Sequence, residues 1–219
     1  MRSPIELMIA LIREGHDPNR ILVKLALRKA LLDCENVLDI GCGVSNTMRQ
    51  LGISHTVGAD GYAPSVEAAK RQKTHDQVIQ CDVSDLSSQF QPKQFDACVA
   101  LDVIEHLTKP DGLKLMADME KIAKKRVVFL TPSGFLPQRH TSNDDLQEHL
   151  SGWEASEMEQ RGYRVMGLLG PKSLRGEYHA LKRRPTAIWG IVSLIGQCLW
   201  SNRHPADAAA ILCVKSIGS

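Results

Sequence analysis

The sequence lacks the features that define several large classes of protein. Its 219 residues include 27 basic and 25 acidic side chains, which give a formal net charge of +2. This excess of positive charge is too small to predict an extended basic surface that binds a nucleic-acid backbone. The longest apolar stretch, residues 186–200, contains Ser193 and Gln197 and is shorter than the roughly twenty residues that cross a bilayer. We therefore expect no nucleic-acid partner and no membrane-spanning helix.

The six cysteines form no metal-binding or disulfide pattern. No Cys-x-x-Cys pair occurs, and no histidine accompanies a cysteine at the spacing typical of zinc sites. The sequence therefore predicts neither a disulfide framework nor a metal site. Cys81 and Cys98 lie in apolar runs, where free thiols behave as small buried hydrophobes, so we expect a reducing, cytoplasmic environment.

Short apolar runs alternate with segments of helical periodicity through most of the chain. After a helical pattern over residues 20–32, five runs rich in Val, Ile, Ala and Cys predict strands, at 36–40, 55–60, 77–81, 95–101 and 126–131. Helical periodicity separates them, as in 64–73 and 112–124. This alternation indicates an α/β fold with a parallel sheet that is covered on both faces.

The pattern changes after residue 131. A predicted helix over 153–161 leads to a sixth strand over 163–168, and a seventh strand over 208–215 follows a long intervening segment. We expect one domain over residues 1–219. Residues 1–34 form a helical lead-in to it, and residues 171–207 form an insertion or lid between the last two strands.

The segment VLDIGCGVSN, from Val37 to Asn46, carries the strongest functional signal. A predicted strand ends in Asp39, and a Gly-x-Gly turn follows before a helix. Gly41 and Gly43 have no Cβ, so the backbone can approach a ligand closely there. A structural turn is the alternative interpretation of this motif.

Two carboxylates at the ends of the next strands favour a nucleoside ligand. Asp60 ends the second predicted strand, where its carboxylate can accept both hydroxyls of a ribose. Asp82 follows the third strand and can accept a hydrogen bond from the exocyclic amine of an adenine.

A nicotinamide-dependent oxidoreductase fits these residues less well. Its fingerprint requires a third glycine where this chain has Asn46. Asp39 is also a poor neighbour for a pyrophosphate and a favourable one for a cationic sulfonium or ammonium group.

The segments VLDIGCG, VGAD, CDVSDL and FDACVALDVIEHL occur in the order typical of class I S-adenosylmethionine-dependent methyltransferases, which the sequence resembles from Val37 to Thr131 and more loosely to Lys215. The resemblance implies a Rossmann-like, doubly wound sheet of seven strands in the order 3-2-1-4-5-7-6, with strand 7 antiparallel and helices on both faces. It implies S-adenosylmethionine as the cofactor and S-adenosylhomocysteine as the product. The cofactor-binding residues that it implies are Asp39, Gly41, Gly43, Asp60, Gly61, Tyr62, Asp82, Val83 and Leu101.

Candidates for the chemistry and for acceptor binding come from later segments. His106 follows the fourth predicted strand and is the candidate general base, although it could instead only fix the loop. His140 and His149, from the segment after the fifth strand, are candidates for acceptor binding; the alternative is that both are solvated surface residues. Trp189 is a third acceptor-binding candidate, and core packing of its helix is the alternative.

Two functions remain open at this level. The first is methyl transfer to a small-molecule or to a lipid- or sugar-linked acceptor by a cytoplasmic enzyme that can contact a membrane peripherally. The basic run from Lys182 to Arg184 beside the apolar stretch supports the membrane contact, although a charge run is more often a solvated surface. The second is a non-catalytic S-adenosylmethionine-binding regulatory module, which would need the same cofactor residues.

Overall fold

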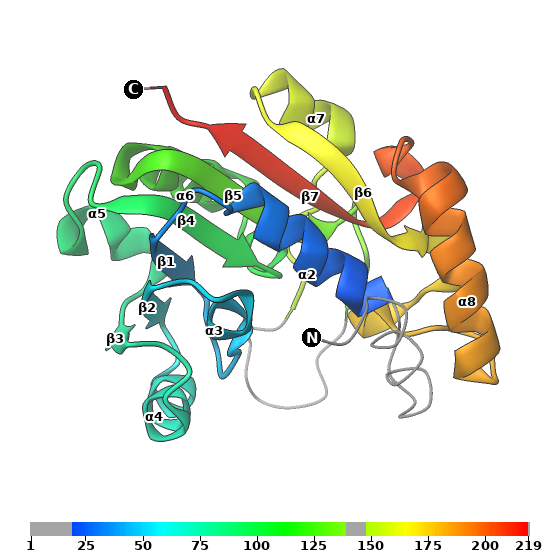
Figure 1. The fold of residues 1–219 in the computed structure, drawn as a ribbon. Helices are drawn as coiled ribbons and strands as arrows, with labels where there is room; N and C mark the ends of the chain where they lie inside the picture. Colours follow the sequence, from blue (N-terminus) through cyan, green and yellow to red (C-terminus); the bar gives the residue numbers. More distant parts are fainter. Residues whose placement is uncertain (1–18, 139–147, 219) are drawn as a thin grey trace.

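The computed structural model describes residues 19–138 and 148–218, which form a twisted sheet flanked by helices (Figure 1). The strands are β1 (Asn36–Ile40), β2 (His55–Asp60), β3 (Gln77–Gln80), β4 (Phe95–Leu101), β5 (Ala123–Pro132), β6 (Arg164–Pro171) and β7 (Ala208–Ser216).

The sheet has the strand order β3-β2-β1-β4-β5-β7-β6. Strands β1 to β5 pair in parallel, whereas β7 runs antiparallel to both β5 and β6. The predicted order and the predicted antiparallel seventh strand are therefore confirmed. Because the five parallel strands point the same way, their carboxyl ends meet at one edge of the sheet, where α/β folds bind ligands.

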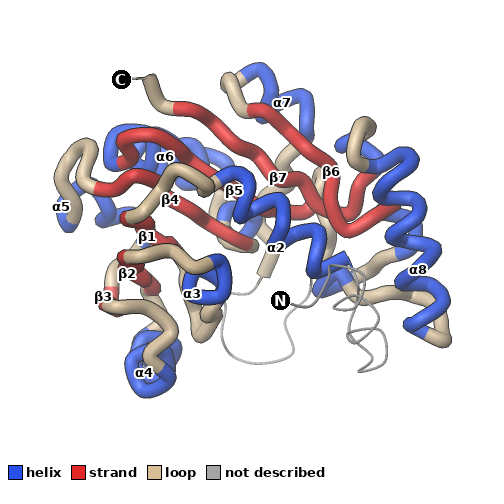
Figure 2. The backbone as a smooth tube through the Cα atoms, in the orientation of Figure 1, coloured by secondary structure: helices blue, strands red, loops and turns tan. Residues whose placement is uncertain are grey.

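Helices lie on both faces of the sheet (Figure 2). They are α2 (Asn19–Ala30), α3 (Thr47–Leu51), α4 (Ala63–Gln72), α5 (Leu86–Gln89), α6 (Lys109–Ile122), α7 (Ala155–Gln160) and α8 (Thr186–Gly196), which a π-helical turn (Gln197–Ser201) extends. Within the described residues, 3-10 turns accompany them: η1 (Val83–Asp85), η2 (Ile104–His106), η4 (Lys172–Leu174), η5 (Glu177–His179) and η7 (Pro205–Asp207).

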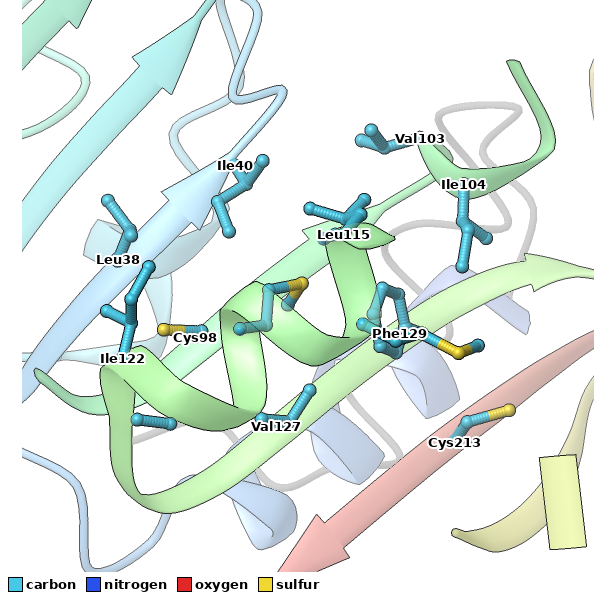
Figure 3. Packing of buried hydrophobic residues seen from close by; sticks show 14 of the residues in the cluster. Leu38, Ile40, Cys98, Val103, Ile104, Leu115, Ile122, Val127, Phe129 and Cys213 are labelled. Atoms are coloured by element: carbon cyan, nitrogen blue, oxygen red, sulfur yellow. The ribbon is translucent and has the colours of Figure 1, made fainter. Parts of the chain in front are cut away.

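Alternate residues of β1, β4, β5, β6 and β7 pack into two separate cores. On one face, Leu38, Cys98 and Phe129 pack with the apolar side of α6 (Figure 3). On the other face, Val37 and Val99 pack with α2 and α3. The helix that the sequence predicted as a lead-in thus covers one face of the sheet.

Some boundaries differ from those that the sequence predicts. Helix α6 begins at Lys109, before the predicted residue 112, because the Thr108 side chain accepts a hydrogen bond from the backbone N–H of Asp111 and caps it. Strand β5 begins at Ala123 because Ala123 already pairs with Phe95 of β4, and a register shift separates this pair from the next one at Arg126. Helix α7 begins at Ala155, since Trp153 forms an isolated bridge with Ser133.

Between β6 and β7 the chain forms η4, η5, α8, the π-helical turn and η7. Helix α8 packs against β6 and α2, at the β6 side of the molecule in Figure 1. No helix in the described part of the chain combines the length and apolar character that crossing a membrane requires.

Candidate active site

A cavity of about 490 Å³ lies at the carboxyl edge of the sheet. Strands β1 and β4 contribute Asp39 and Leu101, and helix α2 closes one side with Val23 and Leu27. The volume is in the range of small-molecule sites. The cavity also takes residues from η2, from the segment after β5 and from the segment between β6 and β7: Glu105, His106, Leu136, His149, Arg175 and His179.

The turn after β1 has a backbone shape that requires glycine. Gly41 has φ +63°, and a Cβ there would lie 2.4 Å from Cγ2 of Val103. Gly43 has φ +49°, and no atom lies within 4 Å of the position of its Cβ. Gly41 can therefore pack against Val103 only because it has no side chain, and Gly43 leaves open space beside the backbone.

The Asp60 carboxylate holds this turn in place. One oxygen accepts a hydrogen bond from the backbone N–H of Gly43 at 2.8 Å, and the other accepts from the N–H of Tyr62 at 2.8 Å. Each carboxylate oxygen has a second lone pair, so both can still accept from a ligand hydroxyl.

Asp82 is exposed and caps η1, where its carboxylate accepts a hydrogen bond from the N–H of Ser84 at 2.8 Å. This bond lowers the pKa of Asp82 below its usual range. Gly61 lies beside it, since a Cβ on Gly61 would be 3.9 Å from an Asp82 carboxylate oxygen. Val83 is half-buried and packs against the core.

Asp39 is more enclosed than the sequence suggests. Its side chain is buried and lies 3.1 Å from Nε2 of His75, whose Nδ1 is 3.0 Å from the hydroxyl of Thr74. Burial raises the pKa of Asp39, and the hydrogen bond from His75 opposes that shift. Sequence reasoning missed His75, because nothing in the residues around it indicates a partner on β1.

The cavity brings together only part of the predicted cofactor set. Asp39, Gly41 and Leu101 line it. The remaining predicted residues stand along the adjoining edge, at the ends of β1, β2 and β3: Gly43, Asp60, Gly61, Tyr62, Asp82 and Val83.

The predicted His106 and His149 meet on the other side of the cavity. Their ring centroids are 4.9 Å apart, in a nearly edge-to-face arrangement. Nδ1 of His106 lies 3.0 Å from the carbonyl oxygen of Glu148, and Nδ1 of His149 lies 2.6 Å from that of Leu136. Burial lowers the pKa of His149, which keeps its ring neutral.

Glu105 lies against the two histidines and is almost completely buried. Its carboxylate accepts a hydrogen bond from the Thr131 hydroxyl at 2.9 Å, and its backbone oxygen accepts from the N–H groups of Leu150 and Ser151. Burial, with the nearby charge of Asp102, raises the pKa of Glu105 to about 8. The sequence presented Glu105 only as the neighbour of His106.

Two further residues at the cavity were missed by sequence reasoning. Asp102 follows β4 with φ +54°, in the left-handed region that few residues other than glycine adopt. Nε2 of His179, from η5, lies 3.7 Å from the Asp102 carboxylate. The segment between β6 and β7 thus reaches the carboxyl end of β4.

Two predicted acceptor residues remain, His140 and Trp189. His140 lies outside the described residues. Trp189 is half-buried on α8, where the Arg183 guanidinium stacks on its ring at 4.6 Å, and it does not line the cavity.

Comparison with known proteins agrees with this architecture. Residues 38–131 match the family described as a methyltransferase domain. Among curated proteins, the probable tRNA methyltransferase 9B of Bos taurus is 32% identical over 87 residues, which is 39% of this chain and 18% of that protein. The human protein of the same name gives the same identity and coverage.

Solved structures share the fold at low identity. The methyltransferase domain of bacterial CtHen1 has a TM-score of 0.57 at 16% identity, over 90% of this chain and 97% of that one. Magnesium protoporphyrin IX methyltransferase from Synechocystis PCC 6803, solved with bound S-adenosylhomocysteine, has a TM-score of 0.54 at 12% identity. The match covers 94% of this chain and 85% of that one.

The chain therefore has the class I methyltransferase fold and matches a methyltransferase-domain family over residues 38–131, so the predicted resemblance is confirmed. The segment that it shares with the curated relatives spans under a fifth of their length.

Proposed function

We propose that this protein transfers the methyl group of S-adenosylmethionine to a small-molecule or to a lipid- or sugar-linked acceptor. The observation that carries the proposal is the cavity at the carboxyl edge, which joins the glycine turn after β1 to the polar group of Glu105, His106 and His149. A donor held at the turn and an acceptor held at the polar group would share this cavity.

The residues present fit the donor. The Gly41–Gly43 turn leaves room for a ligand beside the backbone, and both oxygens of Asp60 can accept ribose hydroxyls. The buried carboxylate of Asp39 suits a cationic ligand at the cavity wall. When bound, S-adenosylmethionine supplies an electrophilic methyl group on a sulfonium.

The chain's own contribution to methyl transfer is alignment. Displacement at a methyl carbon requires the acceptor atom to lie in line with the leaving sulfur, so an enclosed site that fixes both partners accelerates it. His106 and His149 each direct Nδ1 toward a backbone carbonyl, which leaves Nε2 to accept a proton from the acceptor. His106 stays the predicted general base on this argument.

Helix α8 supports a lipid-linked acceptor. Its exposed large apolar residues recur at helical spacing and continue into the π-helical turn: Ile188, Ile191, Val192, Ile195 and Leu199. The exposed cations of the run Lys182–Arg184 precede the helix. An apolar face next to cations is typical of segments that lie on an anionic membrane surface.

The first experiment is a calorimetric titration of the purified chain with S-adenosylhomocysteine, with NADH as the control. We expect micromolar binding of the former and none of the latter. Binding of neither would overturn the proposal.

Acceptors are then separated by class with radiolabelled S-adenosylmethionine. Small-molecule extracts, lipid extracts and tRNA are tested in parallel, because the curated relatives carry tRNA in their names. We expect label in the small-molecule or lipid fraction. Label in tRNA alone would contradict the proposed acceptor, and cofactor binding without labelling of any fraction would favour the non-catalytic regulatory module.

A further inference from the structure

Glu105, His106 and His149 form a compact group of potential metal ligands. Their ligand atoms all lie within 4.8 Å of one another, although His149 is far from the other two in the sequence. No other group of three or more such side chains at metal-binding distances occurs in residues 19–138 and 148–218. All three residues line the cavity.

The hydrogen bonds of the two histidines fix their tautomers. A carbonyl oxygen can only accept, so Nδ1 of His106 donates to Glu148 and Nδ1 of His149 donates to Leu136. Each ring therefore keeps its lone pair on Nε2. Metal-binding histidines almost always donate their other ring N–H in this way, which orients the ring and raises its basicity.

The carboxylate of Glu105 is oriented in the same manner. Thr131 donates to one of its oxygens at 2.9 Å, and the other oxygen is left as a ligand. Glu105 is only 2% exposed, and among the described residues no Lys, Arg or His side chain forms an ion pair with it within 4.0 Å. A buried carboxylate without a cation is costly unless a proton or a metal neutralises it.

We propose that Glu105, His106 and His149 bind a divalent first-row transition-metal ion. Two imidazoles and one carboxylate on one side of an ion are the donor set of sites for Fe²⁺ and similar ions, and they leave coordination positions open. Imidazole ligands disfavour Mg²⁺ and Ca²⁺, which take oxygen ligands. This inference departs from the sequence-based expectation that the chain has no metal site.

The site also narrows the acceptor class, and this step rests on the proposed function. All three ligands line the cavity, so an ion held by them would orient an acceptor oxygen there and stabilise its negative charge. The acceptor is then a hydroxyl-bearing or other oxygen-donor molecule. Methyl transfer would depend on the ion instead of on His106 as a free general base.

The test is two titrations of the metal-free full-length chain. Binding of Co²⁺ is monitored by the visible absorption of the bound ion, and binding of Mn²⁺ is monitored by the loss of the electron paramagnetic resonance signal of the free ion. We expect one Co²⁺ per chain. Replacement of either histidine by Gln, or Glu105→Gln, should weaken binding at least tenfold. The matched control is His55→Gln, which removes an exposed histidine of β2 and should change nothing.

A variant at Thr131 keeps the test informative if a ligand variant fails to fold. Thr131→Val removes the hydrogen bond to Glu105 but retains all three ligands, and loss of such a partner typically weakens metal binding about 10- to 100-fold. Circular dichroism checks the fold of each variant. Co²⁺ binding no tighter than that of an unstructured peptide with equal histidine content, or unchanged in all variants, would overturn the site.

The metal proposal and the proposed function fail separately. S-adenosylhomocysteine binding without Co²⁺ binding would overturn the metal site and leave the function standing. Co²⁺ binding without S-adenosylhomocysteine binding would establish the metal site and overturn the methyltransferase proposal.

Discussion

The two sides of the cavity are built in different ways. The side proposed for the cofactor comes from adjacent strands and the turns that follow them, with Asp60 bonded to the backbone of Gly43 and Tyr62. The side proposed for the acceptor gathers η2, the segment after β5 and η5, which are remote from one another in the sequence. Backbone geometry therefore dominates the first side, and buried side chains that anchor separate segments dominate the second.

This difference predicts that one buried side chain should control the acceptor side. Trp153 is fully buried, and its indole N–H lies 3.2 Å from the carbonyl oxygen of Ile104 and 3.0 Å from the hydroxyl of Ser151. It thus ties the segment after β5 to η2. Trp153→Ala should lower the free energy of unfolding by about 3–5 kcal/mol, measured by urea denaturation, because it leaves a large cavity and unpaired polar groups.

Trp200 provides the matched control for this substitution. It is exposed, and its indole N–H donates to Asp207 at the surface. Trp200→Ala should cost less than about 1 kcal/mol. Equal losses in the two variants would show that Trp153 has no special role in joining the segments.

The cofactor side should respond instead to changes in backbone. Gly41→Ala places a Cβ 2.4 Å from Val103 at φ +63°. We expect a loss of about 3 kcal/mol, from overpacking combined with left-handed strain. Gly43→Ala, at φ +49° with open space, should lose only about 1 kcal/mol. Urea denaturation of the pair separates the two causes, and equal losses would contradict the steric argument at Gly41.

The same contrast explains what the sequence could and could not predict. The resemblance to a family, carried by the ordered motifs, implied the strand order. The apolar runs predicted the first and last residues of β1, β2 and β4 correctly. Gly43 and Asp60 were predicted as separate members of the cofactor-binding set, and they meet because the strands of a parallel sheet end at one edge.

The acceptor side was predicted only in part. His106 and His149 were selected as separate candidates, but their contact depends on Trp153 and on the bonds from Leu150 and Ser151 to Glu105, which no periodicity encodes. His179 was missed for the same reason, because η5 has no repeating pattern that predicts where it packs. Long-range side-chain anchoring, unlike strand order, leaves no signature in a single sequence.

A variant of Asp60 tests whether the cofactor side depends on one carboxylate. Asp60→Ala removes the acceptor for the N–H of Gly43 and Tyr62 and the proposed acceptor for the ribose. Loss of hydrogen bonds to a charged group should weaken S-adenosylhomocysteine binding by about 1.5–3 kcal/mol, or roughly 10- to 150-fold, by calorimetry. Glu159→Ala, an exposed carboxylate variant on α7, serves as the control. Unchanged affinity in Asp60→Ala would refute the ribose assignment.

The smallest effect on stability is expected on α8, which lies beyond both sides of the cavity. Ile195 is 53% exposed, so Ile195→Ser should change the free energy of unfolding by no more than about 0.5 kcal/mol. Binding to anionic phospholipid vesicles should nevertheless fall several-fold, measured by co-sedimentation, because an apolar side chain that enters the lipid interface is lost. Leu32→Ser, an exposed apolar residue just after α2, should leave vesicle binding unchanged. If both variants bind vesicles like the original chain, the apolar face of α8 is not a membrane contact. The support that this face gives to a lipid-linked acceptor is then withdrawn, while the argument from the cavity stands.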